Sequence, residues 1–127
     1  MCSVLLVDDN VQILEFYGLV LEQAGHQVRV AETCARAVGL LQEIEPEIVI
    51  MDLRVPEMED GLGLIRSLKS HVRAPGKPAL KVVVISGWIE DLAGTLERDS
   101  VDCVLPKPVR MELLLQSIAK LVPAVGR

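Results

Sequence analysis

Short, uninterrupted apolar runs alternate along the chain with segments whose apolar residues recur at a helical period. This alternation constrains the fold more than any other feature of the sequence. Three of the runs, at residues 4–7, 48–51 and 82–85, are rich in β-branched side chains and too short to be helices. Continuous apolar runs of this length are typical of parallel strands that are buried on both faces.

Two weaker strands and several helices complete the pattern. A strand is expected at residues 27–31, where apolar and polar residues alternate as in a strand near a sheet edge, and another at residues 103–106. One helix is expected over residues 11–25, with Gly25 as its C-terminal stop, and another follows the N-cap Thr33 through Leu41. A last helix is expected over 111–122. The apolar face expected for the first helix consists of Ile13, Phe16, Tyr17, Val20, Leu21 and Ala24.

Five strand–helix units in alternation predict an α/β fold, a doubly wound five-stranded parallel sheet with helices on both faces. The loop rich in proline and glycine at residues 73–80 is expected to join the third helix to the fourth strand. With 127 residues, the chain is expected to form one domain over residues 1–127, with no output domain.

Composition disfavours several classes of protein. The formal charge is −5, which argues against direct binding of nucleic acid. No apolar run approaches the roughly 20 residues that a membrane helix needs, and no signal peptide is recognisable at the N-terminus. The three cysteines are widely spaced, as is typical of free thiols in the cytoplasm, where we expect the protein to act.

Polar side chains follow four of the expected strands. Asp8 and Asp9 come directly after the first strand, Asp52 ends the third, Ser86 ends the fourth, and Lys107 follows the fifth. The carboxyl ends of parallel strands meet at one edge of the sheet, which is where such folds bind ligands. We therefore expect three carboxylates, a hydroxyl and an ammonium group to lie together.

Three neighbouring carboxylates repel one another unless a cation lies among them. Oxygen ligands in a small cluster suit Mg²⁺, which keeps several waters and often joins a phosphate. Each residue taken alone has a simpler interpretation: Asp9 or Asn10 as a helix N-cap, Ser86 as a turn residue, and Lys107 as a solvated charge. The occurrence of all of them at one end of neighbouring strands favours a functional site.

The segments VLLVDDN, IVIMDLRVPEMEDG, VVVISG and VLPKP, in this order, resemble the receiver domain of two-component response regulators over nearly the whole chain. The resemblance implies a flavodoxin-like (βα)5 fold with strand order 2-1-3-4-5. It implies that Asp52 is the phosphoacceptor. It also implies that Mg²⁺ is held by Asp8, Asp9, Asp52 and the backbone carbonyl of Arg54, and that the phosphoryl group contacts Ser86, Gly87 and Lys107. The Lys107–Pro108 bond resembles the family's cis peptide.

The same resemblance implies a partner that donates the phosphoryl group, either a histidine kinase or a phosphotransfer protein. Docking is expected through Val11, Leu14 and Gly18, on a flank beside the core face of the first helix. A downstream protein of unknown identity and a homodimer are further expected partners. No contact with nucleic acid or membrane is expected.

The sequence departs from the family pattern in three places. Glu59 lengthens the loop after Asp52 by one residue, Val104 stands where relatives carry an aromatic residue, and SVDCV precedes the fifth strand. An alternative interpretation is therefore a receiver-like interaction module that signals without phosphorylation. Trp88, two residues after Ser86, is interpreted either as a shield for the phosphoryl group or as a rim aromatic without a kinetic role.

Two other classes fit the residues poorly. A phosphohydrolase of the haloacid dehalogenase type needs two aspartates spaced D-x-D after one strand and an inserted cap, and the chain shows neither. A dinucleotide-binding domain needs a G-x-G-x-x-G turn after the first strand, which is also missing.

Overall fold

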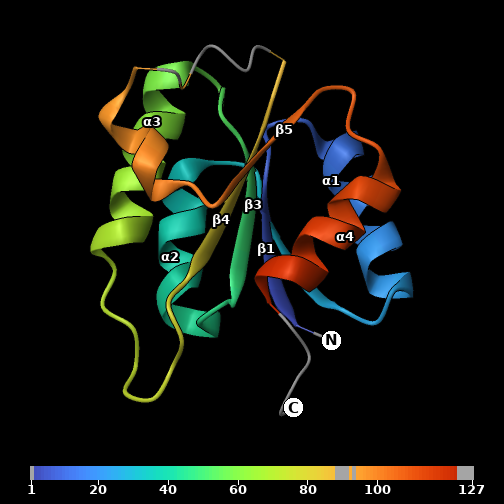
Figure 1. Ribbon diagram of the computed structural model, residues 1–127, viewed down its shortest axis with the longest axis horizontal. Coiled ribbons are helices and arrows are strands. Elements are labelled where there is room, and N and C mark those ends of the chain that lie inside the picture. The colour runs from blue at the N-terminus through green and yellow to red at the C-terminus, as the bar shows by residue number, and fades with distance from the viewer. Residues whose placement is uncertain (1, 88–91, 93, 123–127) are drawn as a thin grey trace.

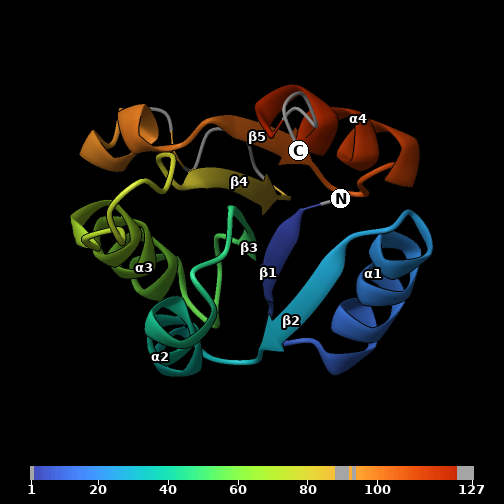
Figure 2. The ribbon, with the colours of Figure 1, turned by 90° about the horizontal axis from the view of Figure 1, so that it is seen from below.

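The computed structural model describes residues 2–87, 92 and 94–122. They form a parallel sheet with helices packed on both faces (Figures 1 and 2). The strands are β1 (Ser3–Val7), β2 (Gln27–Ala31), β3 (Ile48–Asp52), β4 (Lys81–Ser86) and β5 (Cys103–Pro106). The helices are α1 (Val11–Gln23), α2 (Cys34–Ile44), α3 (Met58–Ser70) and α4 (Met111–Leu121), together with the 3₁₀ helix η2 (Leu96–Ser100).

The strand order is β2-β1-β3-β4-β5, and every neighbouring pair is parallel. This confirms the predicted doubly wound sheet. The alternating strand β2 lies at the edge, as its sequence indicated, and three of its five residues are exposed. In contrast, all five residues of β3 are buried, because continuous apolar runs occupy the middle of a sheet that is covered on both faces.

The core consists of two apolar layers separated by the sheet. Helices α2 and α3 cover one face and bury Leu40, Leu64 and Ile65 against it. Helices α1 and α4 cover the other face and bury Leu21 and Ile118. Figure 2 shows the two pairs of helices on opposite sides of the sheet. Each layer removes a contiguous set of aliphatic side chains from water, which is the main favourable contribution to folding.

The first helix is rotated relative to the expected apolar face. Its buried residues are Leu14, Gly18 and Leu21, whereas Phe16 is 56% exposed. Residues spaced four and then three apart lie on one side of a helix, so Leu14, Gly18 and Leu21 form the core-facing stripe. The prediction that placed Phe16 in the core and Leu14 and Gly18 on an exposed flank is therefore wrong.

The connection between β4 and β5 also differs from the expected strand–helix unit. In its described residues it contains the short 3₁₀ helix η2 in place of a full α-helix. Trp88 lies outside the described residues. The other expected helix landmarks are confirmed: the Thr33 hydroxyl accepts a hydrogen bond from the Arg36 amide at 3.1 Å, and α2 ends before Pro46.

No helix in the part of the chain that the structure describes is long and apolar enough to cross a membrane. Cys2, Cys34 and Cys103 all lie in that part, and no disulfide joins them.

Candidate functional site

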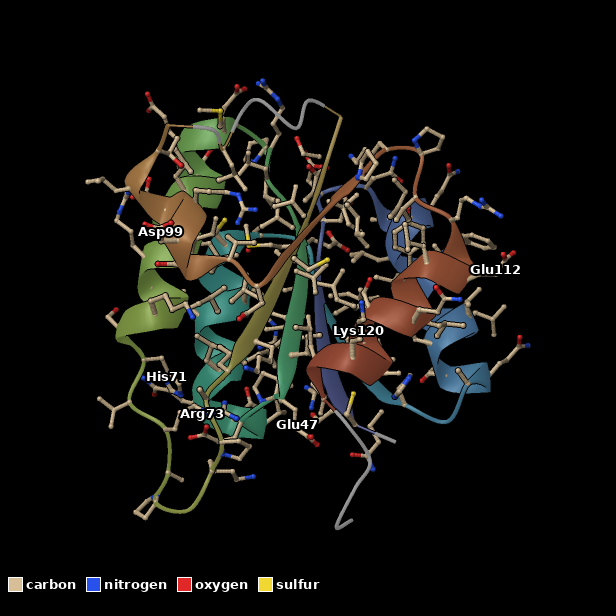
Figure 3. The ribbon with its side chains drawn as sticks, in the orientation of Figure 1. Glu47, His71, Arg73, Asp99, Glu112 and Lys120 are labelled. Carbon is tan, nitrogen blue, oxygen red and sulfur yellow. The ribbon has the colours of Figure 1, made fainter. Side chains whose placement is uncertain are left out.

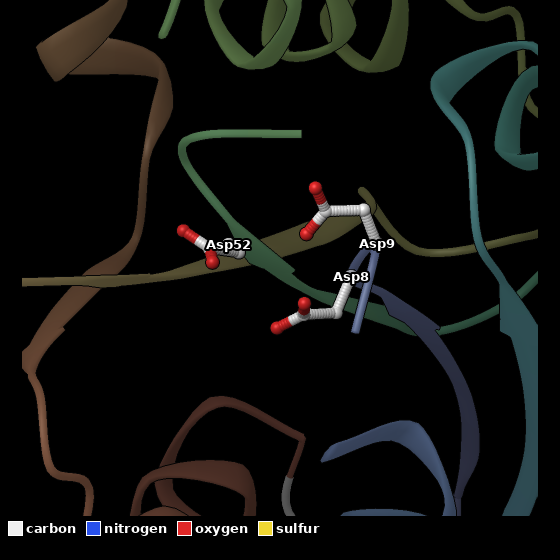
Figure 4. A group of neighbouring side chains, drawn as sticks. All are labelled: Asp8, Asp9 and Asp52. Atoms are coloured by element: carbon white, nitrogen blue, oxygen red, sulfur yellow. The ribbon is translucent and has the colours of Figure 1, made fainter. Parts of the chain in front are cut away.

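Three carboxylates converge at the carboxyl edge of the sheet, where β1 and β3 end side by side. Carboxylate oxygens of Asp8, Asp9 and Asp52 all lie within 4.8 Å of one another (Figure 4). Asp8 and Asp52 are 7% and 9% exposed, whereas Asp9 is exposed. The structure thus brings together the three acidic residues that the sequence placed at the ends of neighbouring strands.

Backbone hydrogen bonds fix the position of the first aspartate. The Asp8 amide donates to the Ala31 carbonyl at 3.2 Å, which continues the pairing of β1 with β2 beyond the strand. One oxygen of the Asp8 carboxylate accepts a hydrogen bond from the Asn10 amide at 2.9 Å. Asn10 is the N-cap of α1, because its side chain accepts hydrogen bonds from the amides of Gln12 and Ile13. Asn10 therefore caps α1, and the Asp9 side chain lies beside Asp8 and Asp52.

Both oxygens of the Asp52 carboxylate have partners. The Arg54 amide donates to Oδ1 at 3.1 Å, and the Lys107 ammonium donates to Oδ2 at 2.6 Å. Lys107 follows β5, the strand at the edge of the sheet opposite β2. Its amide donates a hydrogen bond to the Ser86 carbonyl at 2.9 Å. The Lys107–Pro108 peptide bond is cis, as the sequence indicated, and Val55–Pro56 is a second cis bond that was not expected.

The charges in this pocket perturb one another. Burial raises the pKa of Asp8, and the nearby Asp52 and Asp9 carboxylates raise it further, while the Asn10 hydrogen bond and the Lys107 charge oppose the rise. Burial alone would lower the pKa of Lys107, but the hydrogen bond and attraction to Asp52, aided by Asp8, leave this pKa above its usual value. The pocket therefore favours a positive charge close to its carboxylates.

The donor set fits a small divalent cation. Two oxygens on opposite sides of one Mg²⁺ are about 4 Å apart, given ligand distances of about 2.0–2.1 Å. Among three ligand oxygens at most one pair can lie opposite each other, and adjacent ligand oxygens are about 2.9 Å apart. The three observed oxygens, all within 4.8 Å of one another, therefore have to move closer together to bind one ion directly. Two of its three carboxylates are largely buried, so a cation would also relieve repulsion that water screens poorly.

The other residues that the sequence assigned to the site or to docking differ in their exposure. Ser86 is 2% exposed and ends β4, where its backbone pairs in register with Pro106. Gly87 and Arg54 are exposed. Of the three predicted docking residues, Val11 is 45% exposed, but Leu14 is only 4% exposed and Gly18 is buried.

Tyr17 is a neighbour of the site that sequence reasoning assigned only to the core. Together with Asp8 and Asp52, it lines a small cavity of about 10 Å³ beneath the carboxylates. Burial raises the pKa of the Tyr17 hydroxyl; the Lys107 charge counteracts this, and the Asp8 and Asp52 charges add to it. Sequence reasoning did not separate Tyr17 from the core, because a tyrosine on an apolar helix face is usually interpreted as packing.

Comparison with known proteins relates residues 4–119 to the response regulator receiver domain. The virulence transcriptional regulatory protein PhoP of Salmonella typhimurium is 34% identical over 122 residues, covering 96% of this chain and 52% of PhoP. The transcriptional regulatory protein GlrR of Escherichia coli is 34% identical over 114 residues, which cover 90% of this chain and 24% of GlrR. The chain thus spans about half the length of PhoP and about a quarter of GlrR.

Solved structures show the same architecture. A CheY-like receiver domain from Methylobacillus flagellatus superposes with a TM-score of 0.78 at 28% identity, covering 93% of this chain and 98% of that one. The response regulator TrrA of Thermotoga maritima, solved in complex with Mg²⁺–BeF, superposes with a TM-score of 0.81 at 21% identity, covering 96% of this chain and 100% of TrrA. At that identity the likeness to TrrA concerns the fold alone.

Proposed function

This chain belongs to the response regulator receiver domain family of two-component signalling, and from this premise we propose that Asp52 accepts a phosphoryl group. The donor is a phosphohistidine on a histidine kinase or a phosphotransfer protein. The observation that carries the proposal is the 2.6 Å contact of the Lys107 ammonium with an Asp52 oxygen, inside a cluster of three carboxylates. A cation held at that position can stabilise charge that develops on a transferring phosphoryl group.

In the proposed reaction an Asp52 oxygen attacks phosphorus. An O–P bond forms while the N–P bond to the donor histidine breaks, and the electron pair of that bond returns to the imidazole nitrogen, which takes up a proton. Phosphoryl transfer of this kind passes through a loose transition state, so positioning and electrostatics dominate its rate. Asp52 suits the role of nucleophile because two hydrogen bonds, from Arg54 and Lys107, fix its orientation.

The other residues of the pocket hold and neutralise the phosphoryl group. Lys107 pairs with its oxygens, and the Ser86 hydroxyl and the Gly87 amide donate hydrogen bonds to them. Mg²⁺ would be held by Asp8, Asp9, Asp52 and the backbone carbonyl of Arg54, and when bound it supplies positive charge to the same oxygens. Phosphorylation then changes the binding of a downstream protein, because the modified aspartate carries additional negative charge next to Lys107.

Docking of the donor requires that its phosphohistidine reach the carboxyl edge of the sheet. Val11, in the first turn of α1 and 45% exposed, is the predicted docking residue best placed for that contact. Leu14 and Gly18 lie in the core-facing stripe and support α1 from beneath, so their contribution to docking is indirect.

The test is the intact mass of the protein after incubation with a small-molecule phosphodonor, with and without Mg²⁺. We expect a gain of one phosphoryl group that requires Mg²⁺ and is lost in Asp52→Asn. Asp99→Asn is the matched control, because Asp99 lies exposed on η2 (Figure 3) and is not part of the acidic cluster. An unmodified wild-type protein, still unmodified with a phosphorylated kinase, would instead favour the module that signals without phosphorylation.

A further inference from the structure

A groove runs between α1 and the edge strand β2. It has a volume of about 690 Å³, and its floor includes Leu14, Gly18 and Val28. Because residue 18 is glycine, the floor stays open: a Cβ at that position would meet only the Val28 side chain, at 3.9 Å. We call this feature the α1–β2 groove. Figure 2 shows that α1 lies between α4 on one side and β2 on the other.

Apolar side chains are exposed along the walls of the α1–β2 groove. Val11, Leu19 and Val30, which all line it, are 45%, 55% and 45% exposed. They come from the first turn of α1, its last half and the edge strand, so the exposed apolar surface extends along the whole groove. Exposed aliphatic residues that line one concavity are more informative than the same residues scattered over a surface.

The two sides of the groove carry opposite charges. Glu15 and Glu22, two helical turns apart, line the side formed by α1. Arg29 and Arg36 line the opposite side, where Glu32 partly offsets them. Arg36 also forms an ion pair with Glu43 at 3.9 Å, but both side chains are more than half exposed. Exposed ion pairs of this kind contribute little to stability, so Arg36 is available to a partner.

The shape of the groove selects the kind of occupant. A concave surface complements a convex one, so a second copy presenting the same groove would leave an unfilled space between the two molecules. The α1 side extends from Val11 to Glu22, about 16 Å at 1.5 Å per residue, which matches about three turns of a docked helix. Helices that bind in grooves use an apolar stripe at the spacing i, i+3, i+4 and i+7.

We propose that the α1–β2 groove binds an amphipathic helix of a partner protein. The helix presents its apolar stripe to Val11, Leu19 and Val30. Its flank along Glu15 and Glu22 is basic, and its opposite flank, along Arg29 and Arg36, is acidic. This interaction goes beyond the proposed phosphoryl transfer and does not depend on it.

The position of the groove leaves Asp52 accessible to a small phosphodonor. Strand β1 lies between β2 and β3, so a helix on the β2 side of α1 leaves Asp52, at the end of β3, accessible. Val11 and Glu32 line the end of the groove nearest the acidic pair: Val11 follows Asp9 by two residues, and the Ala31 carbonyl, next to Glu32, accepts a hydrogen bond from the Asp8 amide at 3.2 Å. The partner helix can therefore remain bound while Asp52 reacts with a small phosphodonor, whereas a donor protein that docks on Val11 competes with it.

The test uses a synthetic peptide of about 14 residues, close to four helical turns, with leucines along one face, lysines on one flank and glutamates on the other. Amide chemical shifts of the ¹⁵N-labelled, unphosphorylated protein without Mg²⁺ are followed as peptide is added. We expect saturable shifts centred on Val11, Leu19 and Val30. A peptide with glutamates on both flanks should bind at least about tenfold more weakly, a difference of about 1.4 kcal/mol.

Two protein variants provide the matched comparison. Leu19→Glu and Phe16→Glu change residues of α1 that are 55% and 56% exposed, but only Leu19 lines the groove. We expect Leu19→Glu to weaken peptide binding at least about tenfold and Phe16→Glu to leave it unchanged. Equal affinities for the two variants, shifts centred on Phe16 and α4, or no saturable shifts would overturn the proposal. Groove shifts that depend on protein concentration without peptide would assign the surface to a second copy instead, and would also overturn it.

Discussion

At the scale of single residues, the acidic pair at the end of β1 is explained by its surroundings. Asp8 is 7% exposed and its pKa is raised, so its ionised form is less favourable in the folded protein than in the unfolded chain. The Lys107 charge offsets part of this repulsion, although its short contact is with Asp52. The pocket is thus partly neutralised on the Lys107 side and still favours a second cation beside Asp8 and Asp9.

The raised pKa of Asp8 predicts a pH dependence of stability. Because this pKa is higher in the folded than in the unfolded protein, the folded state binds more protons in the interval between the two pKa values. The free energy of unfolding therefore falls as pH rises through that interval. Asp8→Asn removes the titrating group, so we expect it to raise the free energy of unfolding at pH 7 without Mg²⁺. Urea unfolding at several pH values measures this.

Mg²⁺ should stabilise the same variant less than it stabilises the wild-type protein. If the carboxylates hold Mg²⁺, the wild-type protein should gain about 2.7 kcal/mol at a Mg²⁺ concentration 100 times the dissociation constant. Asp8→Asn should gain much less, because one carboxylate ligand has been lost. An Asp8→Asn protein that is less stable than wild type at pH 7 without metal, yet equally stabilised by Mg²⁺, would contradict both expectations.

Part of the site was predictable from the sequence. Asp8, Asp9, Asp52 and Lys107 were predictable because strand ends are easy to locate and parallel strands end at one edge. The neighbouring position of Tyr17 was not predictable, because it depends on the exact rotation of α1 against the sheet. The roles of these residues in phosphoryl transfer stay predictions until they are measured.

At the scale of elements, the start of α3 includes Glu59, which the sequence assigned to a longer loop after Asp52 but which lies in the first turn of the helix. The helix begins at Met58, and the Glu57 amide donates to the Asp60 carboxylate at 3.2 Å, which caps the first turn. Gly61 then lies so close to β3 that a Cβ would overlap the Leu53 carbonyl. Glycine therefore permits α3 to pack directly against the backbone that follows Asp52.

This contact predicts a difference between two glycines of the same helix. Gly61→Ala should lower the free energy of unfolding by about 1–3 kcal/mol, the usual cost of overpacking. Gly63→Ala is the control, since a Cβ there would meet only the flexible end of Arg66 at 3.6 Å, and alanine favours a helix by up to about 1 kcal/mol. Chemical denaturation of both variants tests the contact, and a Gly61→Ala protein as stable as Gly63→Ala would disprove it.

The elements were predicted unequally well. The strands of the sheet were found because continuous apolar runs mark them, and β2 was placed near an edge because its sequence alternates. The phase of α1 was wrong, because apolar residues surround most of that helix: Phe16 and Leu19 are exposed, and Leu14 is buried. Only contacts with the sheet decide which of these residues lie inside.

At the scale of the whole molecule, the sheet joins two apolar layers into one cooperative unit. Ile65 of α3 and Ile118 of α4 are both fully buried, on opposite faces of the sheet. Neighbouring residues of each strand point to opposite faces, so β1, β3 and β4 contribute to both layers. Loss of packing on either face should therefore weaken the same structure.

We expect Ile65→Val and Ile118→Val each to lower the free energy of unfolding by about 0.5–1.5 kcal/mol. Both should shift one single transition, seen at the same denaturant concentration by far-UV circular dichroism and by amide NMR signals from either face. Separate transitions for the two faces would contradict a shared core. That residues 1–127 form a single domain without an output domain stays a prediction.

Phosphorylation of Asp52 is tested by chemical identification of the phosphorylated residue. The protein is phosphorylated in the presence of Mg²⁺, reduced with borohydride, which converts an aspartyl phosphate to homoserine, and mapped by peptide mass spectrometry. We expect homoserine at position 52 and intact aspartates at positions 8 and 9. Homoserine at position 8 or 9, or a stable phosphoryl group on another type of residue, would contradict it.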